Sequence, residues 1–263
     1  MNFYISSLIK GMDSMEDLAM WINEQPFPGL GVELIAFTHD KEYWNRLRNI
    51  LEKIRCPISF HGPYIGVEAT SKPGTKEYDW MINSYDKVFS LAKEYGVKHI
   101  VFHYTQIGFD KNNINDAQQT SIQNINTLID LSEKHNVNML IENIAFPKGK
   151  LPLYDNEEYG KIFSSKKRAL SIIDIGHAHL NKMNIQEFLS KYAKCVQAYH
   201  FHNNNGLLDE HNSIMDGSFD YLNFLSLYKK YTPNADIVLE YEPHTNLTKE
   251  ELLKDIIYIL ENI

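Results

Sequence analysis

Histidines and carboxylates recur in this chain at the ends of short apolar runs. Glu142 follows the run MLI and Glu240 follows IVL, so both carboxylates stand where burial is costly. Asp174 and His177 form a D-x-x-H pair in the segment DIGHAH. The notable polar residues that these runs or the loops after them carry are Glu33, His61, His103, Glu142, Asp174, His177, His200, His202, Asp209, His211 and Glu240.

A ring of these groups would be mutually repulsive and poorly solvated unless a cation lay among them. Its chemistry is imidazole plus carboxylate, because neither cysteine of the chain belongs to a CxxC pair. Such ligands suit zinc, manganese, cobalt, iron or magnesium. The residue types therefore predict a site for divalent metal and leave the choice of metal open.

Several of these residues also have a purely structural interpretation. His61 precedes GPY and could only shape a turn, and His103, which we place in mid-strand, could be a satisfied core histidine. Asp209 and His211 fall in a predicted loop and are either ligands or solvated groups. Glu33 is expected either to contact the substrate or to be structural.

The two histidines of HFH lie two positions apart in a predicted strand. Side chains alternate along a strand, so His200 and His202 point to the same face. We expect His200 to be the metal ligand and His202 to contact substrate or to support a ligand. Gly176 is expected to let the backbone turn after Asp174, and His179 is expected at the surface or in a supporting position.

Short apolar runs alternate strictly with amphipathic stretches, which demands a parallel sheet. Eight such units, ending on a helix, predict an α/β fold with a single (β/α)8 TIM barrel over residues 1–263. The predicted strands are 3–7, 31–37, 57–61, 99–104, 138–143, 169–174, 196–202 and 236–242. The predicted helices are 13–24 (with a capping residue at its start), 41–54, 75–95 (ended by Gly96), 115–135, 155–165, 184–194, 218–230 and 248–262. The C-terminal ends of the strands form the active-site face of such a barrel.

Composition narrows the function classes. A chain of 263 residues, 43% hydrophobic and without a Pro/Gly/Ser-rich linker, fits one barrel of roughly 250 residues. No signal peptide or membrane span is apparent in the sequence, so we expect no membrane partner, and two unpaired cysteines favour a reducing, cytoplasmic location. The net charge of −8 argues against nucleic acid as a partner. Homo-oligomerisation is left open.

Four segments carry a resemblance that spans nearly the whole chain: HGPY (61–64), IEN (141–143), DIGHAH (174–179) and HFHNNNGLLDEH (200–211). In this order the chain resembles the xylose isomerase-like barrel superfamily, which includes sugar-phosphate isomerases and epimerases as well as endonuclease IV. The isomerase branch implies one divalent ion held by Glu142, Asp174, His200 and Glu240, with His177 beside the substrate. Glu142 and Glu240 would then act as acid and base on a ketose whose oxygens the metal polarises.

The endonuclease branch implies a cluster of up to three zinc ions and hydrolysis of a phosphodiester by metal-activated water. Its ligand positions map onto His61, His103, Glu142, Asp174, His177, His200, Asp209, His211 and Glu240, each filled by the right residue type. Three features argue against it. The chain lacks the glycine-rich HVS-type segment, has HYTQIG in place of HPGS, and has no Lys or Arg in HNNNGLLDEHNSIMDG.

We therefore expect a metal-dependent sugar or sugar-phosphate isomerase or epimerase acting on a small sugar. The alternatives are a multinuclear zinc phosphodiesterase (an abasic-site endonuclease), a dehydratase or aldolase-type lyase, and a binding barrel without turnover. Asn203 replaces an expected Asp and Met215 a Gly, changes expected to weaken support of the site and to reshape the loop. Lys148 and Lys150 are the residues that could reach a phosphate at the mouth.

Overall fold

Eight parallel strands close into a barrel in the order β1 to β8, with β1 paired to β8. The computed structural model describes residues 1–10, 15–166 and 168–263. The strands are β1 (Phe3–Ser6), β2 (Leu30–Ile35), β3 (Ile58–His61), β4 (Ile100–Phe102), β5 (Met139–Glu142), β6 (Leu170–Asp174), β7 (Val196–Phe201) and β8 (Asp236–Leu239). This confirms the predicted α/β barrel.

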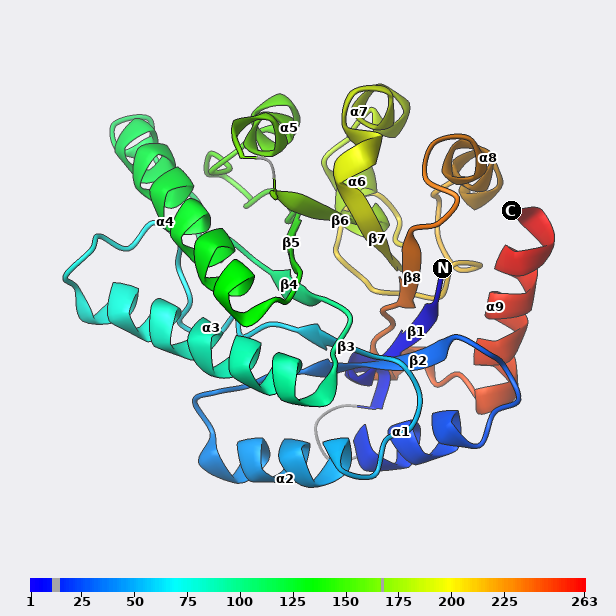
Figure 1. Cartoon of the computed structure of the whole chain (residues 1–263). Coiled ribbons are helices and arrows are strands. Elements are labelled where there is room, and N and C mark those ends of the chain that lie inside the picture. Colours follow the sequence, from blue (N-terminus) through cyan, green and yellow to red (C-terminus); the bar gives the residue numbers. More distant parts are fainter. Residues whose placement is uncertain (11–14, 167) are drawn as a thin grey trace.

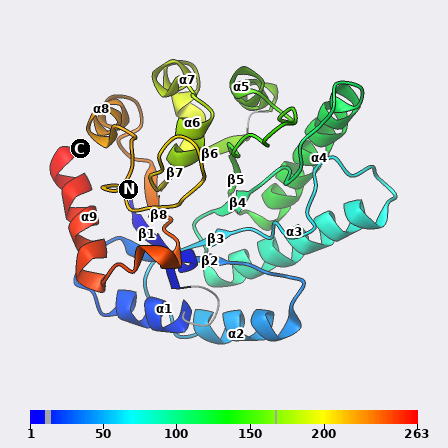
Figure 2. The ribbon, with the colours of Figure 1, turned by 180° about the vertical axis from the view of Figure 1, so that it is seen from behind.

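Helices surround the barrel and connect its strands (Figures 1 and 2). They are α1 (Met15–Asn23), α2 (Lys41–Leu51), α3 (Lys76–Tyr95), α4 (Ile114–His135), α5 (Asn156–Ser165), α6 (Ile175–Leu180), α7 (Ile185–Tyr192), α8 (Tyr221–Tyr231) and α9 (Lys249–Asn262), with short 3-10 segments η1 (Ser7–Lys10), η3 (Ala193–Cys195) and η4 (Pro243–Thr245). None of the described helices is both long and apolar enough to cross a bilayer.

Local sequence signals explain several helix ends. The Thr75 side chain accepts from Tyr78 N at the start of α3, and Gly96 ends that helix in the left-handed conformation with φ 66°. The helix start predicted at residues 13–14 lies outside the described residues. His103, predicted in mid-strand, instead lies just beyond the last residue of β4. A helix, α6, begins directly after Asp174, where a turn was predicted.

The barrel interior holds an apolar layer beneath a polar one. Val101, Leu140, Ile172 and Ala198 form a separate buried cluster, one residue from each of β4 to β7. Because side chains alternate along a strand, the residue two positions further on faces the same interior, one layer nearer the C-terminal ends. Those residues are His103, Glu142, Asp174 and His200. The apolar layer therefore forms the floor on which the polar groups stand.

Candidate metal centre

His200 lies at the centre of the polar layer, surrounded by carboxylates. Its Nδ1 is 3.3 Å from Glu142 Oε2, 3.4 Å from Glu240 Oε2 and 3.8 Å from Asp174 Oδ2. Within the described structure, His200 Nδ1 and Glu142 Oε1 are fully buried and have no hydrogen-bond partner. Buried polar atoms without partners are expensive, so these donors fit a bound cation that would satisfy them.

A second group of donors shares Glu142 with this centre. His103 Nε2 lies 2.9 Å from Glu142 Oε2, and the rings of His61 and His103 are 4.7 Å apart. His61 Nδ1 donates to the carbonyl of Gly62 at 3.0 Å, which leaves its Nε2 free to act as a ligand. Ligand atoms of His61, His103 and Glu142 all lie within 4.8 Å of one another.

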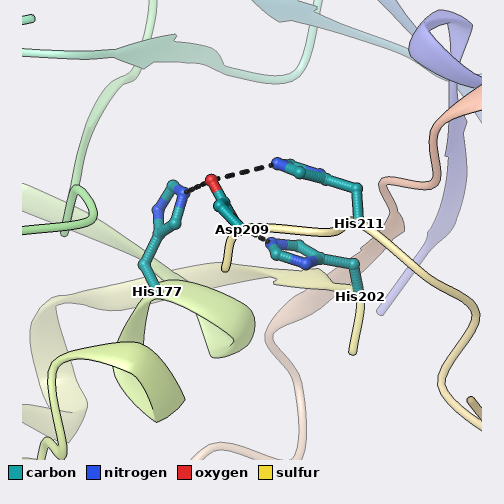
Figure 3. Close-up of side chains that lie close together, drawn as sticks. All are labelled: His177, His202, Asp209 and His211. Atoms are coloured by element: carbon teal, nitrogen blue, oxygen red, sulfur yellow. Dashed lines mark hydrogen bonds and ion pairs between the residues drawn. The ribbon is translucent and has the colours of Figure 1, made fainter. Parts of the chain in front are cut away.

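A third group gathers around Asp209 (Figure 3). Asp209 Oδ2 is 3.0 Å from His177 Nε2 and 3.4 Å from His211 Nε2, and Oδ1 is 3.9 Å from His202 Nε2. The rings of His202 and His211 are stacked with centroids 3.8 Å apart. Three imidazoles, one from α6 and two from the segment that follows β7, thus converge on one carboxylate, and this group could also hold a cation.

Carboxylates and histidines of the site shift one another's pKa values. Burial would raise the pKa of Glu142, but His103 and His200 outweigh it and hold the pKa well below the ordinary range. Burial would lower the pKa of His177, but Asp174 and Asp209 raise it well above the ordinary value. Where no metal ion is bound, protonation of these histidines therefore offsets the charge of the buried acids.

Burial also shifts the pKa of the carboxylate Glu240 and of the imidazole His61, in opposite directions. Burial raises the pKa of Glu240 to about 7, against the attraction of His200 and His211. Burial lowers the pKa of His61 to about 4, so this imidazole is neutral at pH 7 and able to bind a metal.

Asn143 orients two of the donors and was missed as a functional residue in the sequence analysis. Its Nδ2 donates to Asp174 O at 2.9 Å, and its Oδ1 accepts from Asp174 N at 2.8 Å. Its backbone carbonyl accepts from His177 Nδ1 at 2.9 Å, which directs His177 Nε2 toward Asp209. The signal was present in the IEN motif, where the Asn follows Glu142 directly.

Gly176 is required by close packing, not by a turn. It lies within α6, and a Cβ built there would come 1.9 Å from His202 Cε1. Only glycine lets the His202 ring lie against this helix, where His202 Nε2 is 3.0 Å from both oxygens of Asp174. The expectation that Gly176 serves a backbone turn was therefore wrong.

The two expected substrate contacts, Glu33 and His202, both lie outside the cavity lining. Glu33 is completely buried, with Oε1 3.3 Å from His200 Nε2, the ring nitrogen opposite the carboxylate cluster. A carboxylate in this position orients a ligating histidine and raises its basicity. His202 is also completely buried and contacts Asp174 and Asp209.

Asparagines organise the loop that carries Asp209 and His211. Asn203 Nδ2 donates to Ile214 O at 3.0 Å, while its Oδ1 accepts from the backbone N of Asn204 and of Phe219. An aspartate could not make the first of these bonds. Asn203 therefore supports the loop, and the expectation that Asn in place of Asp weakens support of the site stays a prediction.

The donors open into a cavity of about 360 Å³ at the C-terminal ends of the strands. His61, His103, Glu142, His177, Asp209, His211 and Glu240 all contribute to its lining. Among the described residues that line it there is no Lys or Arg. Lys150 is instead paired with Asp110 at 2.7 Å, and Lys148 is exposed outside the lining.

Residues 11–261 match the family model of the xylose isomerase-like TIM barrel, and the chain belongs to this family. An uncharacterized protein of Methanocaldococcus jannaschii is 32% identical over 143 residues, which cover 54% of this chain and 55% of that protein. The chain thus spans about half the length of the curated relatives that it matches.

Solved structures share the complete barrel. A D-tagatose 3-epimerase-like protein is 20% identical, with a TM-score of 0.78 over 99% of each chain. The IOLI protein with a bound zinc atom is 19% identical, with a TM-score of 0.76 over 99% of this chain and 96% of that one. At this level of identity the likeness establishes the fold.

Proposed function

We propose that this protein is a divalent-metal-dependent sugar isomerase or epimerase. The observation that carries the proposal is the central group, in which Glu142 and Glu240 lie within 3.4 Å of His200 Nδ1 and also line the cavity. Asp174 completes four donors from β5, β6, β7 and the end of β8. Two carboxylates that reach both a metal position and the substrate space suit proton transfer at carbons beside a carbonyl.

Glu142, Asp174, His200 and Glu240 would hold the ion. The cation supplies stabilisation of the negative charge that develops on the sugar oxygens during proton transfer. Glu142 at the end of β5 and Glu240 directly after β8 would act on the sugar as base and acid. His177 lines the same cavity and would donate to a sugar oxygen through Nε2, the nitrogen that faces Asp209.

Two proteins of similar fold are consistent with a metal-dependent sugar isomerase or epimerase, and neither specifies the reaction of this chain. One similar fold belongs to a protein described as D-tagatose 3-epimerase-like, and another was solved with zinc. The cavity volume of about 360 Å³ falls at the small end of the range for ligand sites, as expected for a monosaccharide.

Solvent deuterium exchange into unphosphorylated and phosphorylated ketoses, with protein loaded with manganese, tests the proposal. We expect wild-type protein to exchange deuterium at the carbon beside the carbonyl. Glu142→Gln and Glu240→Gln should each reduce the rate by about 10²-fold or more, because each removes a group that transfers a proton. Glu250→Gln, at an exposed position of α9, is the control. Exchange that is equal in all four proteins would refute the proton-transfer roles.

A multinuclear zinc phosphodiesterase is the second candidate, and one observation favours it. The groups around His103 and around Asp209 would offer two further metal positions beside the central one, and the first shares Glu142 with it. Three zinc ions per chain and nicking of abasic duplex DNA would support this activity. About one manganese or zinc per chain, with intact DNA, would exclude it.

A further inference from the structure

A second set of polar groups lies inside the barrel, beneath His200. Glu33 of β2 pairs in register with Ser59 of β3, and the register between β3 and β4 places Ser59 beside His99. Paired residues of parallel strands point to the same side of the sheet, so these three side chains all face the interior. Each of them is buried. The interior beneath His200 is therefore polar on the side of β2 and β3, in contrast to the apolar floor described above.

Glu33 joins this set to the proposed metal ligand, but its contacts are long. His200 Nε2 is 3.3 Å from Glu33 Oε1 and 3.4 Å from Oε2, and Ser59 Oγ donates to Oε2 at 3.4 Å. Hydrogen bonds between N–H groups and carboxylates are usually shorter, at about 2.7–2.9 Å. Within the part of the chain that the structure describes, Glu33 Oε1 makes no hydrogen bond. A further partner is therefore needed to hold this carboxylate under the imidazole.

His99 is the neighbour that can supply this partner. Its Nε2 is fully buried and makes no hydrogen bond to any described residue. Burial lowers the pKa of His99 to about 4, and Glu33 is the carboxylate that opposes this lowering most strongly, as a near neighbour should. The His99 ring lies edge-on to the Tyr4 ring at 5.5 Å, which limits its movement.

The tautomer of His99 decides how it can reach Glu33. Its Nδ1 is 3.9 Å from Asp236 Oδ2, and this carboxylate is itself held by the Asn2 N–H, which donates to Oδ1 at 2.7 Å. Asp236 favours the neutral ring with its hydrogen on Nδ1, so Nε2 is an acceptor. A carboxylate is also only an acceptor. Two acceptors cannot bond to each other, whereas a water molecule between them can donate one hydrogen to each.

We propose that an enclosed water molecule bridges Glu33 Oε1 and His99 Nε2, and that His99 acts through this bridge as a positioning residue for His200. The inference rests on metal binding at His200, as in the proposed function, and does not depend on the reaction catalysed. Buried water molecules usually serve polar groups that lack another partner. A fixed Glu33 keeps the hydrogen of His200 on Nε2 and directs Nδ1 toward the metal position.

Zinc affinity, measured by competition with a chromogenic chelator, tests the role of His99. His99→Phe removes both ring nitrogens and keeps a ring against Tyr4. We expect it to weaken zinc binding by about tenfold and to shift the d–d absorption bands of cobalt-loaded protein, because His200 is then held differently. His99→Gln retains a polar group that can bond the water molecule, and should restore most of the affinity and the wild-type spectrum.

A pair of buried strand serines separates positioning from general loosening of the fold. Ser59→Ala removes the hydroxyl that donates to Glu33, and should also weaken zinc binding by about tenfold. Ser171→Ala is the matched control, because Ser171 is equally buried and its Oγ lies 2.8 Å from Tyr159 Oη, away from the proposed ligands. It should leave zinc affinity unchanged. This pair decides the question if His99→Phe does not fold.

A crystal structure of zinc-loaded wild-type protein, at a resolution that shows ordered water, tests the bridge itself. We expect one water molecule within about 3.2 Å of both Glu33 Oε1 and His99 Nε2. Zinc at the site without this water, unchanged zinc affinity in His99→Phe, or an equal loss in Ser59→Ala and Ser171→Ala would each overturn the inference and leave the metal site intact. If wild-type protein binds neither zinc nor cobalt, the inference and the metal dependence of the proposed function fail together.

Discussion

Asn143 offers a sharp test of how the site is built, because its amide serves the backbone of a proposed ligand. Asn143→Ala removes two buried hydrogen bonds, one to Asp174 O at 2.9 Å and one from Asp174 N at 2.8 Å. Each leaves a buried backbone group unsatisfied, at roughly 2 kcal/mol. We expect the free energy of unfolding of metal-free protein to fall by about 4 kcal/mol, measured by urea denaturation.

Metal affinity should fall in the same variant. Asp174 loses the contacts that orient it toward His200 and His202, and loss of such support weakens metal binding by about 10- to 100-fold. Zinc competition against a chromogenic chelator measures this change. Asn181→Ala is the matched control, because Asn181 also uses both amide atoms on the backbone, accepting from Phe146 N at 2.9 Å and donating to Ile144 O at 2.8 Å.

The control should lose stability without losing metal affinity, since the Asn181 side chain contacts none of the proposed ligands and its backbone bond to His177 O is kept in the variant. Unchanged zinc affinity in Asn143→Ala would refute the claim that this amide positions Asp174 for metal. An equal loss of affinity in both variants would show that the effect comes from general loosening of the fold.

Three further outcomes are expected. Gly176→Ala should destabilise the protein by about 1–3 kcal/mol and lower zinc affinity, because its Cβ would displace the His202 ring; unchanged Tm and affinity would contradict the packing argument. Burial lowers the pKa of His99 to about 4, so its neutral form stabilises the fold fully above pH 6.5 and this stability is lost as pH falls toward 4. The free energy of unfolding of metal-free protein, measured by urea denaturation, should therefore fall by about 3 kcal/mol more over this pH range in wild type than in His99→Gln. Parallel plots of this free energy against pH for the two proteins would contradict the argument. Chelation by EDTA should lower Tm, because repulsion among Glu142, Asp174 and Glu240 is then opposed only by protonated histidines; an unchanged Tm would argue against a bound metal.

The barrel could be predicted because apolar runs report directly on buried strands. Strands β5, β6 and β7 end at or next to the predicted residues, and in the structure the alternation of side chains places Glu142, Asp174 and His200 on the interior face. The roles of these residues in metal binding and catalysis stay predictions.

Depth within the barrel was harder to predict. The same pattern that places Glu142 at the cavity gives no reason to place Glu33 below it, because strand tilt and closure set the height of each residue. Close contacts between residues that are distant in the sequence could not be predicted either. Gly176 is needed because His202, 26 positions later, presses against it, and no local signal of DIGHAH reveals that contact.

The central claim is that a divalent ion binds among Glu142, Asp174, His200 and Glu240. Crystals of protein loaded with manganese or zinc, measured at the absorption edge of the metal, test it directly. We predict an anomalous peak within about 2.0–2.3 Å of donor atoms from these four residues. A metal-loaded crystal without a peak at this position, or with its only peak elsewhere, would contradict the account.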